Sequence, residues 1–94
     1  MNKAQLIEKL SQRTKLTKTQ TETILDATLE IIQESVVKGE DVKLVGFGIF
    51  DKAVRKQRNG RNPKTGETIV IPETIVPRFR PGKDFKNLVQ KQKS

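Results

Sequence analysis

The sequence begins with apolar residues at helical spacing. Leu6, Ile7 and Leu10 recur at intervals of one to four residues, which places them on one side of a helix. Asn2 precedes them, and Gln5 follows Asn2 by three positions, the spacing of a helix N-cap and its reciprocal partner. The pattern predicts a helix that starts directly after Asn2.

A second, longer helical pattern opens at Thr17, again with a glutamine, Gln20, three residues later. It ends at Lys38-Gly39, which we interpret as a basic last turn followed by a C-terminal glycine. Its apolar residues span a stripe roughly 160° wide, whereas a one-sided surface helix needs about 100°. We therefore expect this helix to pack on two sides through Ile24, Leu25, Leu29, Ile31, Ile32 and Val36.

The pattern then changes to that of short strands. Val42 and Leu44 predict one strand, Ile49 and Phe50 begin a second, and the sequence between them predicts a tight turn. The glycines Gly46 and Gly48 are expected to supply backbone angles that larger residues cannot adopt.

A long polar segment follows, and β-branched residues resume only at Thr68–Ile71 and 74–76. The segment contains Asn-Gly, Asn-Pro and Thr-Gly pairs, which favour turns. We predict a hairpin with its tip within residues 60–66. Pro72 and Pro77 interrupt the returning strand in this interpretation, and because proline cannot donate to a ladder they favour a projecting arm over a central strand.

The end of the chain predicts a short helix. Pro81-Gly82 breaks the strand, and Phe85, Leu88 and Val89 would form the inward side of a helix that ends in a tail from Gln90. The fold class is α+β. We expect residues 1–94 to form a single domain, divided into a helical dimerisation base (1–39), a sheet body (40–51 and 76–82), an arm (52–75), and a C-terminal helix with its tail (83–94).

Charge is distributed very unevenly over these parts. The 94 residues carry a net charge of +8. Residues 1–51 hold seven Lys/Arg and eight Asp/Glu, a net charge of −1, whereas residues 52–94 hold twelve and three, a net charge of +9. Six of those cations lie between Lys52 and Lys64. So dense a patch of one sign predicts an anionic partner: nucleic acid, a membrane surface or an acidic protein.

Composition excludes several other classes. The chain has no Cys, His, Trp or Tyr, which removes zinc fingers, iron–sulfur clusters, haem ligation and Cys/His or Ser/His catalysis. It has no apolar run long enough for a membrane span, and its N-terminus does not resemble a secretory signal. A membrane-surface module would need a basic amphipathic helix, whereas the basic run carries turn and strand signals. We expect no catalytic residue, metal, cofactor, membrane or small-molecule substrate.

Size predicts a partner copy. Without the arm roughly 70 residues remain to build a core, and chains of that size usually need disulfides, metals or a partner. We therefore predict an obligate homodimer in which the second helices and the sheets share one core and two arms project.

The arm carries the candidate chemistry. Arg55, Arg58 and Arg61 recur every three residues, so both faces of a strand ribbon would carry cations, which suits insertion into a groove lined by phosphates. Pro63 places a rigid apolar ring at the tip. Minor-groove architectural proteins insert such wedges between base steps and kink the duplex.

The motifs that connect these features resemble the bacterial HU/IHF histone-like DNA-binding proteins: Gly46 to Phe50, the arm arginines, Gly60 to Gly66, and Phe79 to Lys83. The resemblance covers essentially the whole chain. It implies an intertwined dimer with a helical base, a small antiparallel sheet and two protruding β-ribbon arms that clasp double-stranded DNA in the minor groove and bend it. It assigns DNA contacts to Lys3, Arg55, Arg58, Arg61, Asn62, Pro63, Lys64, Arg80, Lys83 and Lys86, and core packing to Phe47, Phe50 and Phe79.

Alternatives stay open within and beyond this resemblance. The minor groove distinguishes little more than A·T from G·C base pairs, and the sequence has no element rich in Asn or Gln that would contact bases specifically. This favours low sequence specificity, and therefore the HU branch over a site-specific IHF-like subunit. An RNA-binding basic dimer is a further alternative, although RNA readers usually display aromatic side chains. A heterodimer with a related chain is compatible with the sequence. The resemblance implies a cytoplasmic protein of the bacterial nucleoid.

Overall fold

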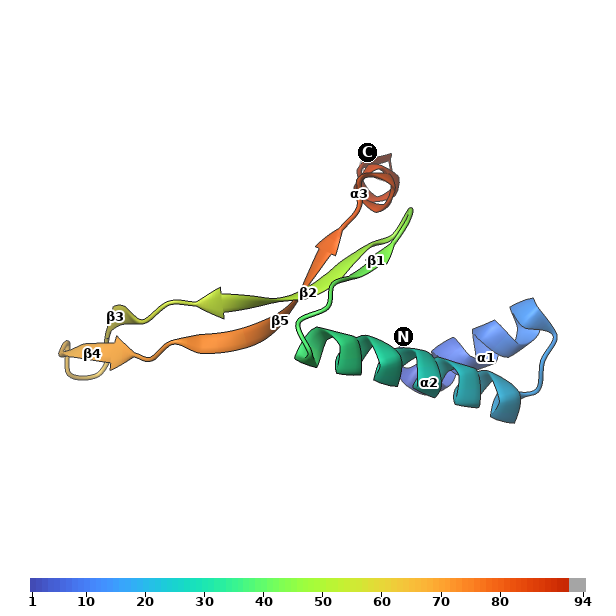
Figure 1. Cartoon of the computed structure of the whole chain (residues 1–94), viewed down its shortest axis with the longest axis horizontal. Helices are drawn as coiled ribbons and strands as arrows, with labels where there is room; N and C mark the ends of the chain where they lie inside the picture. Colours follow the sequence, from blue (N-terminus) through green and yellow to red (C-terminus); the bar gives the residue numbers. More distant parts are fainter. Residues whose placement is uncertain (92–94) are drawn as a thin grey trace. The chain divides into compact units, whose positions relative to one another are not determined.

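The computed structural model describes residues 1–91 (Figure 1). Helices combine with antiparallel strands, which confirms the predicted α+β class. Gln90 and Lys91 still belong to the last helix, whereas the rest of the expected tail, 92–94, lies outside the described residues. The elements are α1 (Lys3–Thr14), α2 (Lys18–Val37), β1 (Val42–Leu44), β2 (Gly48–Arg55), β3 (Arg58–Arg61), β4 (Thr68–Ile71), β5 (Thr74–Pro81) and α3 (Lys83–Lys91).

The chain divides into two compact units, Met1–Glu34 and Ser35–Ser94. In the first, α1 starts with the predicted capping box: the Gln5 amide donates to Asn2 Oδ1 over 2.9 Å, and the Asn2 amide donates to Gln5 Oε1 over 3.0 Å. The same reciprocal pair recurs at Thr17 and Gln20 ahead of α2, with both distances 3.1 Å. Two helix starts predicted from spacing are thus confirmed.

Little apolar surface is buried within the helical unit. Ile7 is 7% exposed and is the one buried apolar residue in the part of the chain that the structure describes. Ile24, Leu29 and Ile31 on α2 are exposed, Ile31 by 62%. Leu25, Ile32 and Val36 are partly buried, so within one chain about half of the predicted stripe is left exposed. The expected packing of α2 on a second side therefore stays a prediction about a partner copy.

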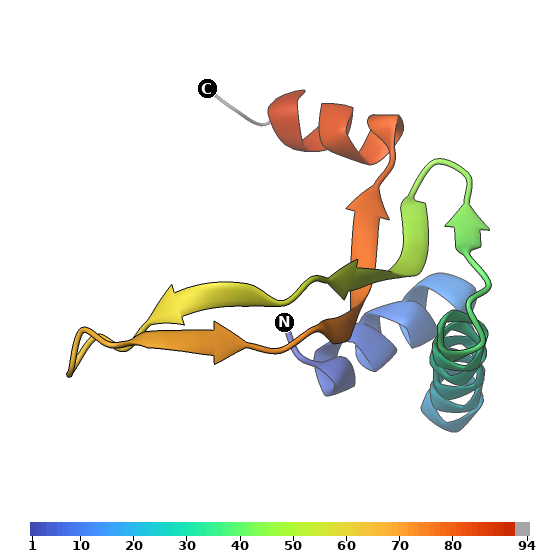
Figure 2. The ribbon, with the colours of Figure 1, turned by 60° about the vertical axis from the view of Figure 1, so that its left-hand side comes forward.

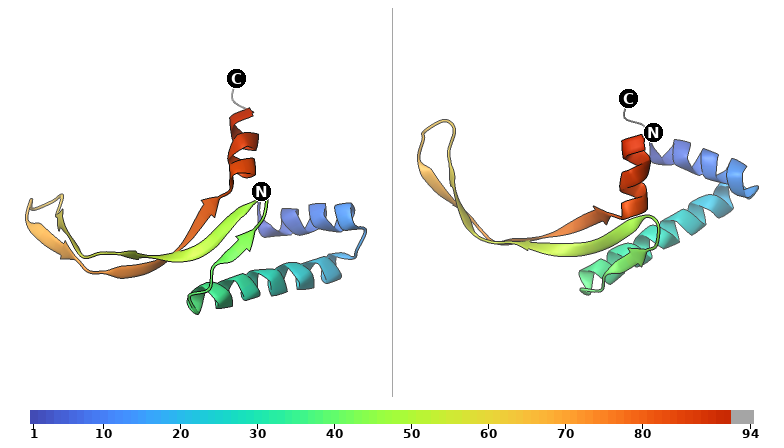
Figure 3. Two further views of the ribbon diagram at one scale, coloured as in Figure 1. Left: turned by 45° about the horizontal axis from the view of Figure 1, so that its top comes forward. Right: turned by 90° about the horizontal axis from the view of Figure 1, so that it is seen from above.

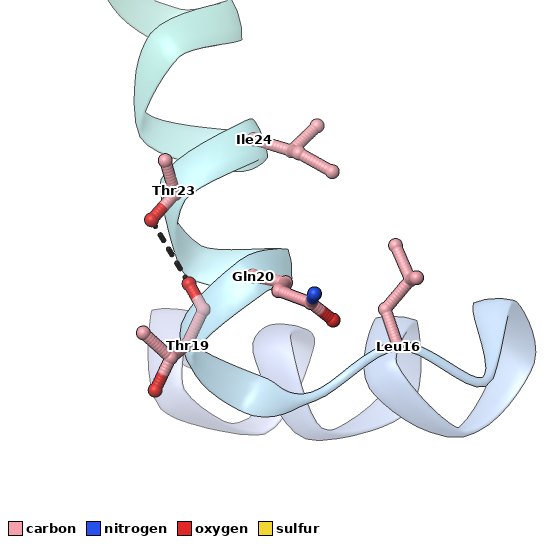
Figure 4. A pocket seen from close by; sticks show the side chains of 5 residues that line it. All are labelled: Leu16, Thr19, Gln20, Thr23 and Ile24. Atoms are coloured by element: carbon pink, nitrogen blue, oxygen red, sulfur yellow. Dashed lines mark hydrogen bonds between the residues drawn. The ribbon is translucent and has the colours of Figure 1, made fainter.

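The exposed side chains of Leu16 and Ile24 border a shallow hollow at the start of α2. Leu16 and Ile24 form its apolar walls, together with Thr19, Gln20 and Thr23 (Figure 4). Thr23 donates its hydroxyl to the Thr19 carbonyl over 3.0 Å, and the side-chain oxygen of Gln20 accepts from the Thr17 amide. The hollow therefore offers no charged group and few free polar atoms to a ligand.

The second unit is built on a three-stranded antiparallel sheet of order β1-β2-β5, with Val42 opposite Phe50 and Phe50 opposite Phe79. Strands β2 and β5 continue toward a separate two-stranded ladder of β3 and β4, which forms the far end of the predicted hairpin arm (Figure 2). The views in Figure 3 show this ribbon projecting away from β1 and α3.

The two ladders of the arm keep one register. The first ends at Arg55 opposite Thr74, and the second starts at Arg58 opposite Ile71, so two residues on each strand separate them. Pro72 lies in this gap and interrupts the returning strand as predicted. Pro77 does not: it lies inside β5 opposite Lys52. The strand tolerates it because β5 is at the edge of the sheet, where one side of the strand needs no ladder partner.

The glycines near the sheet differ in their physical role. Gly39 after α2 and Gly46 in the β1–β2 turn have φ of +89° and +82°, the left-handed region that favours glycine. Gly48 does not have a positive φ, so the expectation that it supplies a special angle is wrong. A Cβ there would lie 2.6 Å from both the Arg80 carbonyl oxygen and the Phe79 ring. Gly48 is needed for space.

At the C-terminal end of α2 the predicted C′ glycine is confirmed, because the Gly39 amide donates to the Val36 carbonyl and the Glu40 amide to the Ser35 carbonyl. The predicted basic last turn is wrong. The helix ends at Val37, its last turn has no cation, and Lys38 lies outside it. Lys52 from β2 takes that role, because its ammonium donates to the Val37 carbonyl over 3.1 Å. A cation at this end is favourable for the helix dipole.

Four phenylalanines pack against one another in the sheet unit, although Phe47 and Phe79 remain exposed within one chain. Phe50 and Phe79 have ring centroids 4.8 Å apart, and Phe47 lies 5.2 Å from Phe79 and 5.3 Å from Phe85 of α3. Leu88 and Val89 remain 62% and 61% exposed. Of the expected inward side of α3, only Phe85 packs within this chain. Within residues 1–91, none of the helices combines the length and hydrophobicity needed to cross a membrane.

Candidate nucleic-acid interface

The arm places its arginines on both sides of a thin ribbon. Arg55 lies opposite Thr74, and Arg61 lies opposite Thr68. Because alternate residues of a strand point to opposite faces and the two ladders keep one register, these two share a side, and Arg58 lies on the other. All three are exposed, and no acidic residue within 1–91 forms an ion pair with them. Their charges are available to a partner.

The tip is a turn organised by Asn62. Its amide donates to the Glu67 carbonyl and its own carbonyl accepts from the Gly66 amide, both over 2.8 Å. Its side-chain oxygen accepts from the Lys64 amide over 2.9 Å. Pro63 lies exposed inside this frame, and Gly66, with φ of +74°, allows the chain to return. Asn62 is thus half-buried and holds the turn that presents Pro63 and Lys64.

Lys3 belongs to the helical unit. Its ammonium lies 2.6 Å from Asp26 Oδ1 on α2, and the hydrogen bond that it donates to this carboxylate, followed by the carboxylate's charge, raises the pKa of Lys3. The side chains are 55% and 38% exposed, so this is a surface ion pair of the kind that contributes little to stability. Lys3 would have to exchange this partner to contact an anion.

Arg80 belongs to a cluster that the sequence did not predict. Asp51 on β2 lies opposite Arg78 on β5 and is 5% exposed. It accepts from Arg78 Nε over 2.8 Å, from Arg78 Nη2 over 3.0 Å and from Arg80 Nη2 over 2.6 Å. These bonds, the one from Arg78 above all, hold the pKa of Asp51 below its usual value near 3.8, against the opposing effect of burial.

Two features of the sequence point to this cluster. Asp51 is the one acid between Asp41 and Glu67, and it falls where the arm leaves the sheet. Arg78 and Arg80 alternate with Phe79, which places both arginines on the side of β5 opposite to the aromatic core. A count of net charge over the whole segment hides this pairing.

Lys83 and Lys86 lie on the first turn of α3, three residues apart and exposed. No group of three or more possible metal ligands occurs among residues 1–91. The described part of the sheet unit therefore presents exposed cations on the arm and on α3, and a buried carboxylate with two arginines where the arm begins.

Comparisons with known proteins agree with this arrangement. A family described as "Bacterial DNA-binding protein" matches residues 1–90. DNA-binding protein HU of Clostridium pasteurianum is 50% identical over 91 residues, which cover 97% of this chain and 100% of that protein. The HU protein of Staphylococcus aureus is 46% identical over 90 residues, 96% of this chain and 100% of that protein.

Solved structures give the same result. An Anabaena HU–DNA cocrystal structure superposes with a TM-score of 0.88 at 47% identity and covers 95% of this chain and 97% of that one. HU from Thermotoga maritima has a TM-score of 0.69 at 34% identity, over 95% and 98% of the two chains. With its sequence matched from end to end by HU proteins and its fold shared with them, the chain belongs to the bacterial DNA-binding protein family that includes HU.

Proposed function

We propose that this protein is a histone-like architectural protein that binds duplex DNA in the minor groove with low sequence specificity, bends it and compacts the bacterial chromosome. The observation that carries the proposal is the arm: a two-stranded ribbon with exposed arginines on both sides and an exposed proline at its tip. The family is one of DNA-binding proteins, not of enzymes. Its site of action would be the nucleoid in the cytoplasm.

Each part of the chain has a role in this proposal. Residues 52–75 form the DNA-binding arm, in which Arg55, Arg58, Arg61 and Lys64 contact phosphates and groove edges. Pro63 wedges between base pairs, held in place by the turn around Asn62. Arg80, Lys83 and Lys86 on the sheet body and α3, with Lys3 on α1, add phosphate contacts. The cost of unstacking is a few kcal/mol and is offset by the contacts that a bent duplex allows.

The protein acts as a homodimer in this proposal. Its support is the apolar surface that one chain leaves uncovered, on α2 at Ile24 and Ile31 and on α3 at Leu88 and Val89. Burial of such surface is the main favourable contribution to association. The helical base (1–39) and the sheet body (40–51 and 76–82) would supply the shared core, together with the C-terminal helix (83–94).

The HU branch is favoured over a site-specific IHF-like subunit, since the relatives of 46–50% identity are named HU. RNA binding has less support, because the four phenylalanines pack against one another in the sheet unit and none lies on the basic arm (52–75), where bases would stack.

A mobility-shift assay with linear, nicked and pre-bent duplexes of unrelated sequence tests the proposal, with an RNA duplex as competitor. We expect all three DNAs to bind, with tighter binding to the nicked and pre-bent ones, because these cost less to deform. Competition by RNA at equal concentration, or strong dependence on one sequence, would contradict it.

A further inference from the structure

The cluster of Asp51, Arg78 and Arg80 has an unbalanced charge. One carboxylate, 5% exposed, faces two guanidinium groups whose side chains are 47% and 51% exposed. The Asp51 carboxylate is therefore buried under the two guanidinium groups, which face solvent. The cluster has one positive charge in excess. Asp41 also attracts Arg78 electrostatically, but within residues 1–91 it forms no ion pair with it.

The two guanidinium groups also keep most of their donors. Each has five N–H bonds. Arg78 uses two of them on Asp51 and Arg80 uses one, so three and four remain. Guanidinium groups match the geometry of phosphate oxygens and can bind them through two parallel hydrogen bonds.

Asp51 also fixes where these donors are. An exposed arginine loses rotamer freedom when it binds, and a side chain that is already held loses less, so binding is tighter for the same contacts. We infer that Asp51 is a positioning residue that holds Arg78 and Arg80 as a preformed site for a backbone phosphate of duplex DNA, where the arm joins the sheet.

The register of β2 and β5 supports a backbone phosphate of duplex DNA as the ligand of this cluster. Arg80 lies opposite Ile49 and Arg78 opposite Asp51, and Arg55 lies four residues beyond Asp51 on the same side of the ribbon. At strand spacing this separation is about 13 Å. A duplex held along this side of the arm would present its backbone to Arg55 and to the cluster. The inference thus rests on the proposed function and adds a phosphate contact, with Arg78 and Asp51 as new participants.

The direction in which Asp51→Asn changes the affinity for DNA separates a positioning role from an effect of net charge. Asp51→Asn adds one positive charge, so a general electrostatic field alone predicts tighter DNA binding. The inference predicts weaker binding to a duplex of about 30 base pairs, by about tenfold, the scale of a charge-assisted hydrogen bond lost. Asp41→Asn is the matched control: it makes the same change of charge near Arg78 without breaking a bond, and should bind as tightly as the wild type or more tightly.

Salt dependence adds a readout that loss of stability would not produce. Each phosphate contact contributes about 0.9 to the slope of log K against log salt concentration. The Asp51→Asn slope should be shallower than that of the wild type by about this amount for each protomer whose contact is lost, whereas that of Asp41→Asn should not.

A second variant covers the case in which Asp51→Asn does not fold, judged by circular dichroism. Arg78→Lys keeps the charge and a partner for Asp51 but loses the planar fork, and should weaken binding by about three- to tenfold. If Asp51→Asn is folded and binds as tightly as the wild type, or Arg78→Lys binds equally well, the inference is overturned. If the wild type itself does not bind duplex DNA, the proposed function fails instead.

Discussion

In the proposed function, Pro63 is the residue on which DNA bending depends. Its ring is exposed in a turn that three hydrogen bonds to Asn62 hold in place. We predict that Pro63→Ala reduces bending of a linear duplex, measured by fluorescence transfer between its ends, while its affinity falls by no more than about tenfold, because the arm's phosphate contacts remain.

The control for this change is a proline away from the tip. Pro72→Ala removes a ring in the gap between the two ladders and should leave the bend as it is. Equal bends for the wild type and Pro63→Ala would remove the wedge role from this residue.

Asp51 gives a pH dependence with a definite sign. Its pKa in the folded protein lies below the ordinary value near 3.8, so the folded state resists protonation more than the unfolded state. The stability that its bonds supply is therefore present above about pH 4 and is lost as the pH falls through the folded-state pKa.

The measurement is the thermal midpoint of the wild type and of Asp51→Asn at several pH values from about 6 down to 2.5. The wild type should be the more stable at the upper end, and the difference should shrink as the pH falls below about 4. A difference that stays constant would show that the carboxylate charge does not stabilise the fold.

At the scale of elements, the helix starts could be predicted because they depend on local chemistry. The side chains at Asn2 and Thr17 bond to backbone three residues away, so spacing alone identifies them. The hairpin tip was predictable for the same reason, since Asn62 and Gly66 form its turn locally.

Features that depend on contacts distant in sequence were not predicted, because they require the strand register. The need for glycine at position 48 arises from Phe79 and Arg80 on another strand, and the end of α2 is stabilised by Lys52, fifteen residues later. The cluster at Asp51 combines residues 27 and 29 positions apart. The residue types are visible in the sequence, but only the register of β2 and β5 shows that Asp51 lies opposite Arg78.

The arm as an element should be only marginally ordered on its own, because an isolated two-stranded ribbon is marginally stable in water. Amide hydrogens of β3 and β4 should exchange rapidly in the free protein and more slowly, by about tenfold or more, in the DNA complex. Amides of Gly48–Phe50, within the three-stranded sheet, should change little. Equal exchange of β3 and β4 with and without DNA would contradict binding through the arm.

At the scale of the whole molecule, a single chain leaves its apolar surface uncovered. The wide stripe of α2 predicted a partner, and in one chain Ile24, Leu29 and Ile31 of that stripe are exposed. We therefore predict that the thermal midpoint rises with protein concentration, because dissociation accompanies unfolding in an obligate dimer. Calorimetry over a hundredfold range of concentration measures this, and a constant midpoint would indicate a self-sufficient monomer.

The central claim is that the cations of residues 52–94 clasp the phosphates of a double helix. The most direct measurement is the affinity for duplex DNA as a function of salt concentration. If about 6–10 phosphates are neutralised, log K against log salt concentration should have a slope of about −5 to −9. Replacing Arg55, Arg58 and Arg61 by glutamine should make that slope much shallower, whereas a flat response in the wild type, or an unchanged slope in the variant, would contradict the account.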